Sequence, residues 1–534
     1  MRAVPQSAKT ESVDVVIVGA GISGVAAGYH LTQQAPDRTF VILEAKESFG
    51  GTWLTHIYPG IRSDSDLYTF GYRFKPWTGA PIAGGEDIRR YMGSVIEEAN
   101  ISHRIRYGYR VERARWSSAD KVWTLEARRA DTGKIVCFTT GFLWMCQGYY
   151  HHDKGYTPDW PGMNDAYQGR VVHPQSWPKS LSLAGKKVVV VGSGTTAATL
   201  IPNIADECQH VTMLQRSPTY FAYGKNANDL ADTLRALEID ERWIHEIVRR
   251  QILSQDAHFT RRALDEPEAV RQELLGEVSR LLGPEVTEKH FSPRYRPWRQ
   301  RLAFLPEADL FRAIQEGKAS VVTDEIERFT AKGLLLKSGK SLEADIVVTA
   351  TGFNLCVMGD IGFVIDGQPL DLAGTVTYRG MMFTGVPNLV YVFGYLRASW
   401  TLRADLVGDF VCRLLNHMKA RRVKKVEVVL RPDDAALPRL PWIDPENFNP
   451  GYLMRSMHLL PKRLDKPQWQ HSQDYSSDRK SFPAIDLDAS EFVYDDRRAT
   501  AYIPADGILA PVGTEDSNTM EASPLLEVGS GKAP

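Results

Sequence analysis

Two glycine-rich turns, each joining an apolar run to a helical segment, constrain the fold of this chain more than any other feature. The first, DVVIVGAGISG, has its small residues at Gly19, Gly21 and Gly24. The second, KKVVVVGSGTTAA, has them at Gly192, Gly194 and Ala197. Glycine permits a sharp turn and lets the backbone approach a pyrophosphate at a helix N-terminus. We therefore expect an α/β fold with two Rossmann-like dinucleotide-binding domains.

The residues that end the following strands suggest different nucleotides. The strand FVIL closes with Glu44, a carboxylate that can accept hydrogen bonds from the ribose hydroxyls of FAD or NAD. After the second turn, Arg216 and Ser217 stand where that acid would be. An arginine pairs with a 2′-phosphate that an acid would repel, so NADPH is expected at the second site, with Thr195 contributing.

The pattern of strands and helices divides the chain into ranges. Between residues 224 and 304, charged segments such as ADTLRALEIDERWIHEIVRRQI have apolar residues at helical spacing, which predicts a helical insertion. Alternating strand and helix patterns return after it. The expected parts are a flexible N-terminus at 1–12, a discontinuous FAD-binding domain at 13–165 and 355–500, an NADP-binding domain at 166–223 and 305–354, and a mobile tail at 501–534.

Composition excludes several other functions. The chain has 64 Lys and Arg against 65 Asp and Glu, so its net charge of −1 provides no field for a nucleic acid partner. No stretch approaches 18 consecutive apolar residues, so no transmembrane helix is expected, although peripheral membrane contact stays open. The N-terminus lacks the apolar core of a secretory signal, which favours the cytoplasm. Nothing in the sequence indicates an oligomeric state.

The five cysteines narrow the chemistry further. They are scattered, with no C-x-x-C pair and no metal-ligand spacing, so neither a redox-active disulfide nor a metal site is expected. A chain that binds FAD and NADPH must pass its electrons to some acceptor. Dioxygen is the remaining electron acceptor, since its reaction needs no protein nucleophile and no metal.

Three further motifs carry a family resemblance. The segment from Gly50 to Asp64, GGTWLTHIYPGIRSD, resembles the GGxWxxxxYPGxxxD signature of Baeyer–Villiger monooxygenases. The segment YQGRVVHPQSWP resembles their FxGxxxHxxxWP fingerprint, with Tyr167 in the leading position, and ATG at 350–352 resembles a linker motif of flavin-containing monooxygenases. The resemblance runs from about residue 13 to 460 and is greatest to the ethionamide-activating subgroup. The site residues that it assigns are Gly51, Thr52, Trp53, Asp64, Gly169, His173, Trp177 and Thr351.

The resemblance implies a reaction and two catalytic residues. Family members use FAD, NADPH and O2 to insert one oxygen atom beside a ketone carbonyl through a C4a-peroxyflavin, giving an ester or lactone, and some also oxidise thioethers. An arginine against the flavin, balanced by the aspartate of the YPG segment, matches Arg301 and Asp64. A fixed guanidinium would stabilise the anionic peroxide and the anionic adduct.

Alternatives remain open at this stage. Tyr167, and Gln300 where many members have lysine, favour an enzyme restricted to S- or N-oxygenation. A more distant alternative is a non-catalytic or uncoupled flavoprotein. His173 is expected to lie on a linker between domains rather than to act as a base. Among the tryptophans, Trp53 and Trp177 are expected at the site, whereas Trp400 is expected only to pack.

Overall fold

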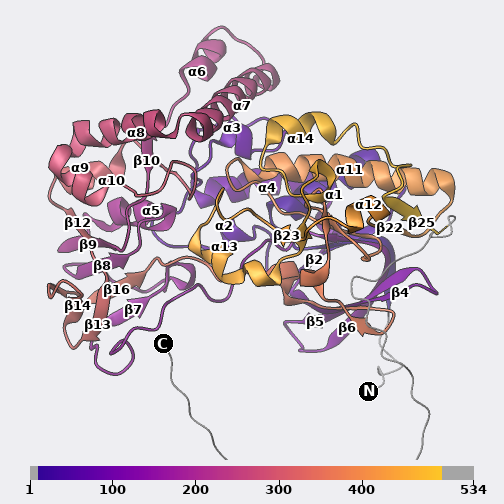
Figure 1. Ribbon diagram of the computed structural model, residues 1–534, viewed down its shortest axis with the longest axis horizontal. Helices are drawn as coiled ribbons and strands as arrows, with labels where there is room; N and C mark the ends of the chain where they lie inside the picture. The colour runs from indigo at the N-terminus through magenta and orange to yellow at the C-terminus, as the bar shows by residue number, and fades with distance from the viewer. Residues whose placement is uncertain (1–9, 496–534) are drawn as a thin grey trace, which may run out of the picture. The chain divides into compact units, whose positions relative to one another are not determined.

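A computed structural model describes residues 10–495, and its largest sheet has nine strands. Strand β1 (Glu11–Val18) pairs in parallel with β2 (Phe40–Glu44) and β6 (Ile135–Met145). The strand order is β18-β17-β4-β5-β6-β1-β2-β3, with β21 pairing beside β6 (Figure 1). The remaining strands are β3 (Ile105–Tyr107), β4 (Tyr109–Ser117), β5 (Val122–Arg129), β17 (Gly362–Ile365), β18 (Gln368–Pro369) and β21 (Leu389–Tyr391).

The second large sheet is entirely parallel, in the order β12-β9-β8-β16-β7. Its strands are β7 (Arg170–Val172), β8 (Lys187–Val191), β9 (His210–Gln215), β12 (Ala319–Thr323) and β16 (Ile346–Thr349). A three-stranded antiparallel sheet lies between β12 and β16 in the chain, formed by β13 (Ile326–Thr330), β14 (Gly333–Leu336) and β15 (Ser341–Glu343). Two sheets with parallel strands after the glycine turns confirm the expected Rossmann-like α/β fold.

Burial on both faces explains why the strands before the glycine turns are continuously apolar. In β1, Val15 and Ile17 pack under α1 (Ile22–Gln34), α4 (Gly85–Glu98) and α11 (Trp400–Arg421), while Val16 and Val18 join the core on the opposite face. In β8, Val188 and Val190 face α5 (Thr195–Ile204) and α10 (Asp309–Gln315). Helix α11 crosses α1 closely at Gly408. A Cβ at this position would lie 2.4 Å from the His30 ring, so the close approach requires glycine.

The segment predicted as a helical insertion is largely helical. It lies between β10 (Phe221–Gly224) and β11 (Ala303–Pro306), which pair in parallel. Between them run α6 (Asp229–Ala236), α7 (Glu241–Asp265), α8 (Pro267–Leu282) and α9 (Pro284–His290) (Figure 1). The buried Arg249 of α7 donates to the backbone carbonyls of Tyr68, Thr69 and Gly71, so α7 is anchored to the segment that follows Asp64.

Shorter elements complete the described chain. The short helices are α2 (Thr52–Thr55), α3 (Leu67–Phe70), α12 (Pro432–Ala435), α13 (Gly451–Ser456) and α14 (Tyr475–Ser481). The short strand pairs are β19 (Thr377–Tyr378) with β20 (Met382–Phe383), β22 (Val426–Val428) with β25 (Phe492–Tyr494), and β23 (Leu440–Pro441) with β24 (Lys462–Arg463). Among the described residues, no helix is both long and apolar enough to cross a membrane.

The structure also bears on the ends of the predicted domains. Strand β1 begins at Glu11, earlier than the boundary expected at residue 13, because Glu11 and Ser12 pair with Phe138 and Thr139 of β6. The predicted tail, 501–534, and most of the predicted flexible N-terminus lie outside the described residues. The division of the remaining chain into FAD- and NADP-binding domains stays a prediction.

Candidate functional site

The first glycine turn has no room for larger residues at two of its three positions. Gly19 has φ +99°, and a Cβ on it would lie 2.8 Å from the carbonyl oxygen of Cys146 at the end of β6. A Cβ on Gly24 would lie 1.8 Å from the carbonyl oxygen of Gly19. Gly21, the N-cap of α1, instead faces Gly51, and a Cβ there would make only an ordinary contact of 3.6 Å. The backbone at Gly21 is therefore accessible at a helix N-terminus, as pyrophosphate binding requires.

Glu44 is held at the end of β2 by the backbone. One carboxylate oxygen accepts a 2.7 Å hydrogen bond from the amide of Ala20, inside the glycine turn, and the other accepts a 2.9 Å bond from the amide of Lys46. The side chain is buried, at 7% exposure. Each oxygen keeps a further lone pair, so Glu44 can still accept from ribose hydroxyls.

The GGTW segment lies against the same turn. The amide of Gly50 donates to the carbonyl of Ala20, and Gly51 begins α2 with φ +55°. The hydroxyl of Thr52 lies 2.7 Å from the phenol of Tyr150, while Trp53 meets Phe70 edge to face. Gly51 and Thr52 thus adjoin the helix N-terminus at which the pyrophosphate is expected, and Trp53 packs beside them.

Arg301 and Asp64, 237 residues apart in the chain, form a bidentate ion pair. Arg301 Nε and Nη2 each donate a 2.9 Å hydrogen bond to a different oxygen of Asp64. The charge of Asp64 raises the pKa of Arg301, and 38% of the arginine side chain stays exposed. Asp64 therefore fixes the planar guanidinium and leaves part of it accessible to another group.

Aromatic side chains, of which the sequence singled out only Trp400, lie beside this pair. The phenols of Tyr149 and Tyr452 interact electrostatically with Arg301, and burial raises the pKa of both. Trp400 stacks on Tyr149, with ring centroids 5.2 Å apart, and its Nε1 donates to Ser23 in α1. Trp400 thus links the Arg301 region to the first glycine turn. Nothing in the sequence spacing of these residues indicates that they meet.

Two histidines at positions that no sequence motif specifies also adjoin the GGTW segment. His56 lies 3.2 Å from the hydroxyl of Tyr150, and His152 lies 2.6 Å from that of Thr55. Burial lowers the pKa of His56 to about 3 and that of His152 to about 4. Both imidazoles are therefore neutral at pH 7 and take part in a neutral hydrogen-bond network.

The second glycine turn is more open. Gly192 has φ +132°, and a Cβ on it would lie 2.3 Å from the carbonyl oxygen of Ala350. Gly194 caps α5, and a Cβ there would meet no atom within 4 Å. Thr195 begins α5, whereas Ala197 is fully buried in its core. Gly194 and Thr195 thus present an accessible helix N-terminus, and Ala197 lets the helix pack closely on the sheet.

Arg216 and Ser217 lie at the exposed end of β9. Among the described residues Arg216 forms no ion pair, and its charge lies close enough to Arg455 to affect that residue. Burial, opposed by Tyr156 and reinforced by Arg216, lowers the pKa of Arg455. The hydroxyl of Ser193 donates to the carbonyl of Ser217 and so ties this segment to the glycine turn. A hydrogen bond from Lys337 and, less strongly, the charge of Arg216 lower the pKa of Glu325. Two nearby guanidiniums suit a phosphate.

The fingerprint residues occupy connecting segments. His173 Nε2 lies 3.3 Å from the carbonyl of Gly352, its Nδ1 accepts from the amide of Gln175, and burial lowers its pKa. Gly169 is required, since a Cβ would lie 2.3 Å from the hydroxyl of Tyr167. Trp177 is buried in the core of the second sheet and not at the Arg301 pair.

Thr351 contributes to the same connection, since its hydroxyl donates to the carbonyl of Tyr156, and the amide of Tyr156 donates to the carbonyl of Gly352. The ATG segment, the fingerprint histidine and Tyr156 are therefore hydrogen-bonded together. That His173 is not a base stays a prediction.

The YPG segment packs against helices of the second sheet. A Cβ on Gly60, whose φ is +75°, would lie 2.2 Å from the side chain of Asn203 in α5. Arg62 donates a 2.6 Å hydrogen bond to Asp309 of α10. Asp64, four residues after Gly60, holds Arg301. The segment that carries the catalytic candidate Asp64 is therefore fixed against the second sheet's helices.

These arrangements fit the two nucleotides. Gly21 and Gly194 each present an unobstructed helix N-terminus, Glu44 retains acceptor capacity, and Arg216 is exposed. The fold and site define a protein of the class that holds a flavin and a nicotinamide nucleotide in one chain, with a charged guanidinium fixed by an aspartate.

Comparison with known proteins identifies the family. A model for an NAD(P)-binding Rossmann-like domain matches residues 17–77, and one for L-lysine 6-monooxygenase/L-ornithine 5-monooxygenase matches residues 89–355. The FAD-containing monooxygenase EthA of Mycobacterium tuberculosis is 46% identical over 479 residues, which cover 88% of this chain and 95% of that protein. The chain belongs to the family of FAD-containing monooxygenases, which confirms the resemblance and the expected FAD.

Solved structures share the fold. An oxidised steroid monooxygenase bound to NADP superimposes with a TM-score of 0.72 at 21% identity, covering 90% of this chain and 99% of that one. A cyclohexanone monooxygenase with ε-caprolactone bound superimposes with a TM-score of 0.67 at 19% identity, covering 91% and 100%.

Proposed function

We propose that this FAD-containing monooxygenase uses NADPH and O2 to convert a ketone into an ester or lactone, and that it also oxidises thioethers. In the balanced reaction, one atom of O2 enters the bond between the carbonyl carbon and its neighbour, and the other leaves as water. NADPH and one proton supply the two electrons and the hydrogens of that water. When bound, FAD accepts hydride from NADPH and passes the electrons to O2.

The Arg301–Asp64 pair is the observation that carries this proposal. Oxygen insertion beside a carbonyl develops negative charge first on the attacking oxygen and then on the carbonyl oxygen. Arg301 keeps its charge at every working pH, and Asp64 orients it through two hydrogen bonds. An oxygen held as an anion attacks a carbonyl, whereas a protonated one is attacked by sulfur or nitrogen.

NADPH is proposed as the reductant because of Arg216. Its guanidinium lies at the end of β9, where the ribose of a nucleotide bound at Gly194 is expected, and Arg455 is close enough to strengthen a positive field there. The NADP bound by the steroid monooxygenase of the same fold supports this assignment. The ε-caprolactone bound by cyclohexanone monooxygenase supports the ketone as substrate class, since that lactone is the oxygen-insertion product of cyclohexanone.

Heteroatom oxygenation alone is a second candidate. The match to L-lysine 6-monooxygenase/L-ornithine 5-monooxygenase over residues 89–355 favours it, because these amino acids carry amines. In the sequence, Tyr167 and Gln300 also favour an enzyme restricted to S- or N-oxygenation.

One product analysis separates the two candidates. The holoenzyme is supplied with NADPH, ¹⁸O₂ and a probe that carries both a ketone and a thioether, and the products are identified by mass spectrometry. The proposal expects ¹⁸O in the ester as well as in the sulfoxide. Sulfoxide without ester would replace the proposal with the second candidate, and NADPH consumption without either product would indicate an uncoupled oxidase.

A further inference from the structure

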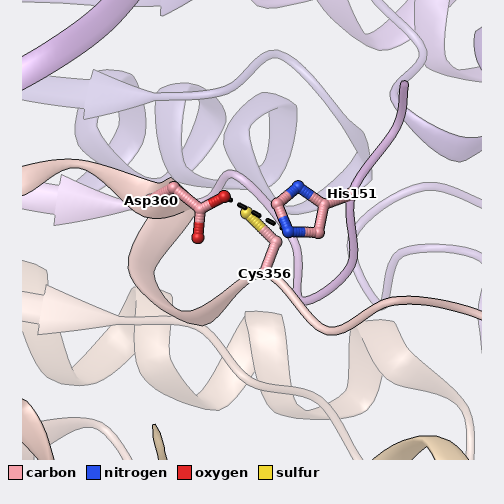
Figure 2. Close-up of side chains that lie close together, drawn as sticks. All are labelled: His151, Cys356 and Asp360. Carbon is pink, nitrogen blue, oxygen red and sulfur yellow. Dashed lines mark ion pairs between the residues drawn. The ribbon is translucent and has the colours of Figure 1, made fainter. Parts of the chain in front are cut away.

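Three side chains of the kinds that bind transition metals converge outside the residues assigned to FAD and NADPH. Figure 2 shows His151, Cys356 and Asp360 turned toward one another. Their ligand atoms all lie within 4.8 Å of one another, and His151 Nε2 is 3.2 Å from Asp360 Oδ2. The cysteines are scattered in the sequence, which is why the sequence predicts no metal site. Folding brings Cys356 close to His151, which lies 205 positions earlier in the chain.

The backbone holds the two contributing segments together. The amide of His151 donates to the carbonyl of Asn354, and the amide of Cys356 donates to the carbonyl of Tyr149, each at 2.9 Å. The two segments therefore lie side by side as a short antiparallel pair. Main-chain hydrogen bonds between them position the imidazole and the thiol.

Asp360, the third residue of the cluster, lies in an unusual turn. Met358, Gly359 and Asp360 have φ values of 52°, 73° and 53°, three left-handed residues in succession. Two of them are not glycine, and such conformations cost free energy that neighbouring structure must offset. The turn brings the carboxylate of Asp360 back toward Cys356. The exposed His151–Asp360 pair does little to offset that cost, because surface ion pairs stabilise weakly.

We propose that His151, Cys356 and Asp360 bind a zinc ion. Thiolate, imidazole and carboxylate are together the ligand set of Zn²⁺, whereas Mg²⁺ and Ca²⁺ select oxygen ligands. Tetrahedral zinc with bonds of roughly 2.0–2.3 Å needs its ligand atoms somewhat closer than the widest separation here, a change that side-chain rotation can provide. Water would complete the coordination. On binding, the thiol releases its proton to solvent as the sulfur–zinc bond forms.

A nucleophilic role for Cys356 fits less well. Burial, reinforced by Asp360, raises the pKa of its thiol to about 12, so little thiolate is present at neutral pH. A reactive cysteine requires the opposite shift, whereas a bound cation deprotonates a coordinating thiol directly.

The site is accessible and lies at a sensitive place. His151 lines a cavity of about 460 Å³, together with Tyr156, Phe353 and Arg455. The two segments that supply the ligands precede and follow the second sheet in the chain. A zinc ion would therefore clamp these two connections together, independently of the proposed oxygenation.

The test uses the FAD-loaded full chain. The protein is treated with chelator, incubated with ZnCl2 and dialysed, and zinc and FAD are then measured per chain by plasma mass spectrometry and absorbance. Isothermal titration with ZnCl2 gives the affinity, and titration in two buffers of different ionisation enthalpy gives the protons released. We expect one zinc ion per chain and proton release. Binding of no zinc after dialysis would overturn the proposal.

Variants locate the ion. Cys356→Ser and Asp360→Asn should each weaken zinc binding at least about tenfold, since even groups that merely support metal ligands matter by that much. Cys208→Ser is the matched control, because Cys208 is likewise partly buried and its thiol pKa is also raised to about 12. It should bind zinc as the parent does. FAD content shows that each variant is folded. Equal zinc affinity in Cys356→Ser and the parent would overturn the assignment.

Discussion

Arg301 and Asp64 meet through two parallel hydrogen bonds of 2.9 Å, although 237 residues separate them in the chain. The arginine follows α9, the last helix of the insertion, and the aspartate ends the YPG segment, which Arg62 ties to Asp309. The geometry fixes the plane of the guanidinium, so the positive charge has one direction before any substrate arrives.

Replacing Arg301 should separate the two halves of the reaction. In Arg301→Ala, ester formation is expected to fall about 10²–10³-fold, the usual cost of losing one preorganised charge stabiliser. Reduction of FAD by NADPH, followed anaerobically by stopped-flow absorbance, should survive in part. Arg299→Ala is the control, because Arg299 pairs with the exposed Glu446. Parent-level ester yield in Arg301→Ala would remove Arg301 from the proposed chemistry.

Replacing Arg216 should change the choice of nucleotide. A charged hydrogen bond contributes about 1.5–3 kcal/mol, so Arg216→Ala should raise the KM for NADPH by about tenfold or more and leave that for NADH nearly unchanged. Steady-state kinetics with both nucleotides measure this. Arg328→Ala is the control, at an exposed arginine paired with Glu327 on β13, and it should leave the KM values for both nucleotides unchanged. Equal rises in both KM values would make Arg216 structural.

The glycines allow a matched comparison of folding and binding. In Gly24→Ala the new Cβ would lie 1.8 Å from a backbone oxygen, so the turn must shift, with a cost of about 1–3 kcal/mol or more and loss of FAD. In Gly194→Ala the Cβ meets nothing within 4 Å, and the φ of −77° suits alanine. The melting temperature of Gly194→Ala should therefore match the parent, while NADPH binds more weakly because the phosphate can no longer approach the backbone. Unchanged NADPH affinity would place the pyrophosphate elsewhere.

Local motifs could be predicted from the sequence because their residues are neighbours in the chain. The turn at Gly19, the carboxylate of Glu44 and the open helix start at Gly194 each depend on one strand–turn–helix unit. The pairing of Arg301 with Asp64 could be expected only by resemblance, because no spacing rule relates positions so far apart.

Contacts between distant segments had no signal in the sequence. Tyr452 and Trp400 reach the Arg301 region from two different C-terminal segments, and Arg455, on the same helix as Tyr452, approaches Arg216. Trp177 illustrates the reverse case, since its motif was recognised but its side chain is buried in a core. The sequence identifies residue types, whereas tertiary packing decides which of them meet.

His471 provides a pH prediction that is separate from the nucleotide sites. Burial, reinforced by the charge of Arg403, lowers the pKa of His471 to about 3. Its Nε2 lies 3.1 Å from the carbonyl of Phe393 and its Nδ1 lies 2.7 Å from Gln473, so the neutral imidazole is well satisfied. In the unfolded chain the same group titrates near pH 6.5.

The sign of the effect follows from the proton balance. Below about pH 6.5 the unfolded chain binds a proton at His471 that the folded protein does not, so stability falls as pH falls towards about 3. At pH 5.5 this residue alone contributes a loss of about 1.4 kcal/mol relative to pH 7.5. His471→Gln keeps an amide that can hydrogen-bond but cannot titrate, so its melting temperature, measured with excess FAD, should fall less between pH 7.5 and 5.5 than that of the parent. Parallel pH curves for the two proteins would show that His471 is not responsible for the acid sensitivity.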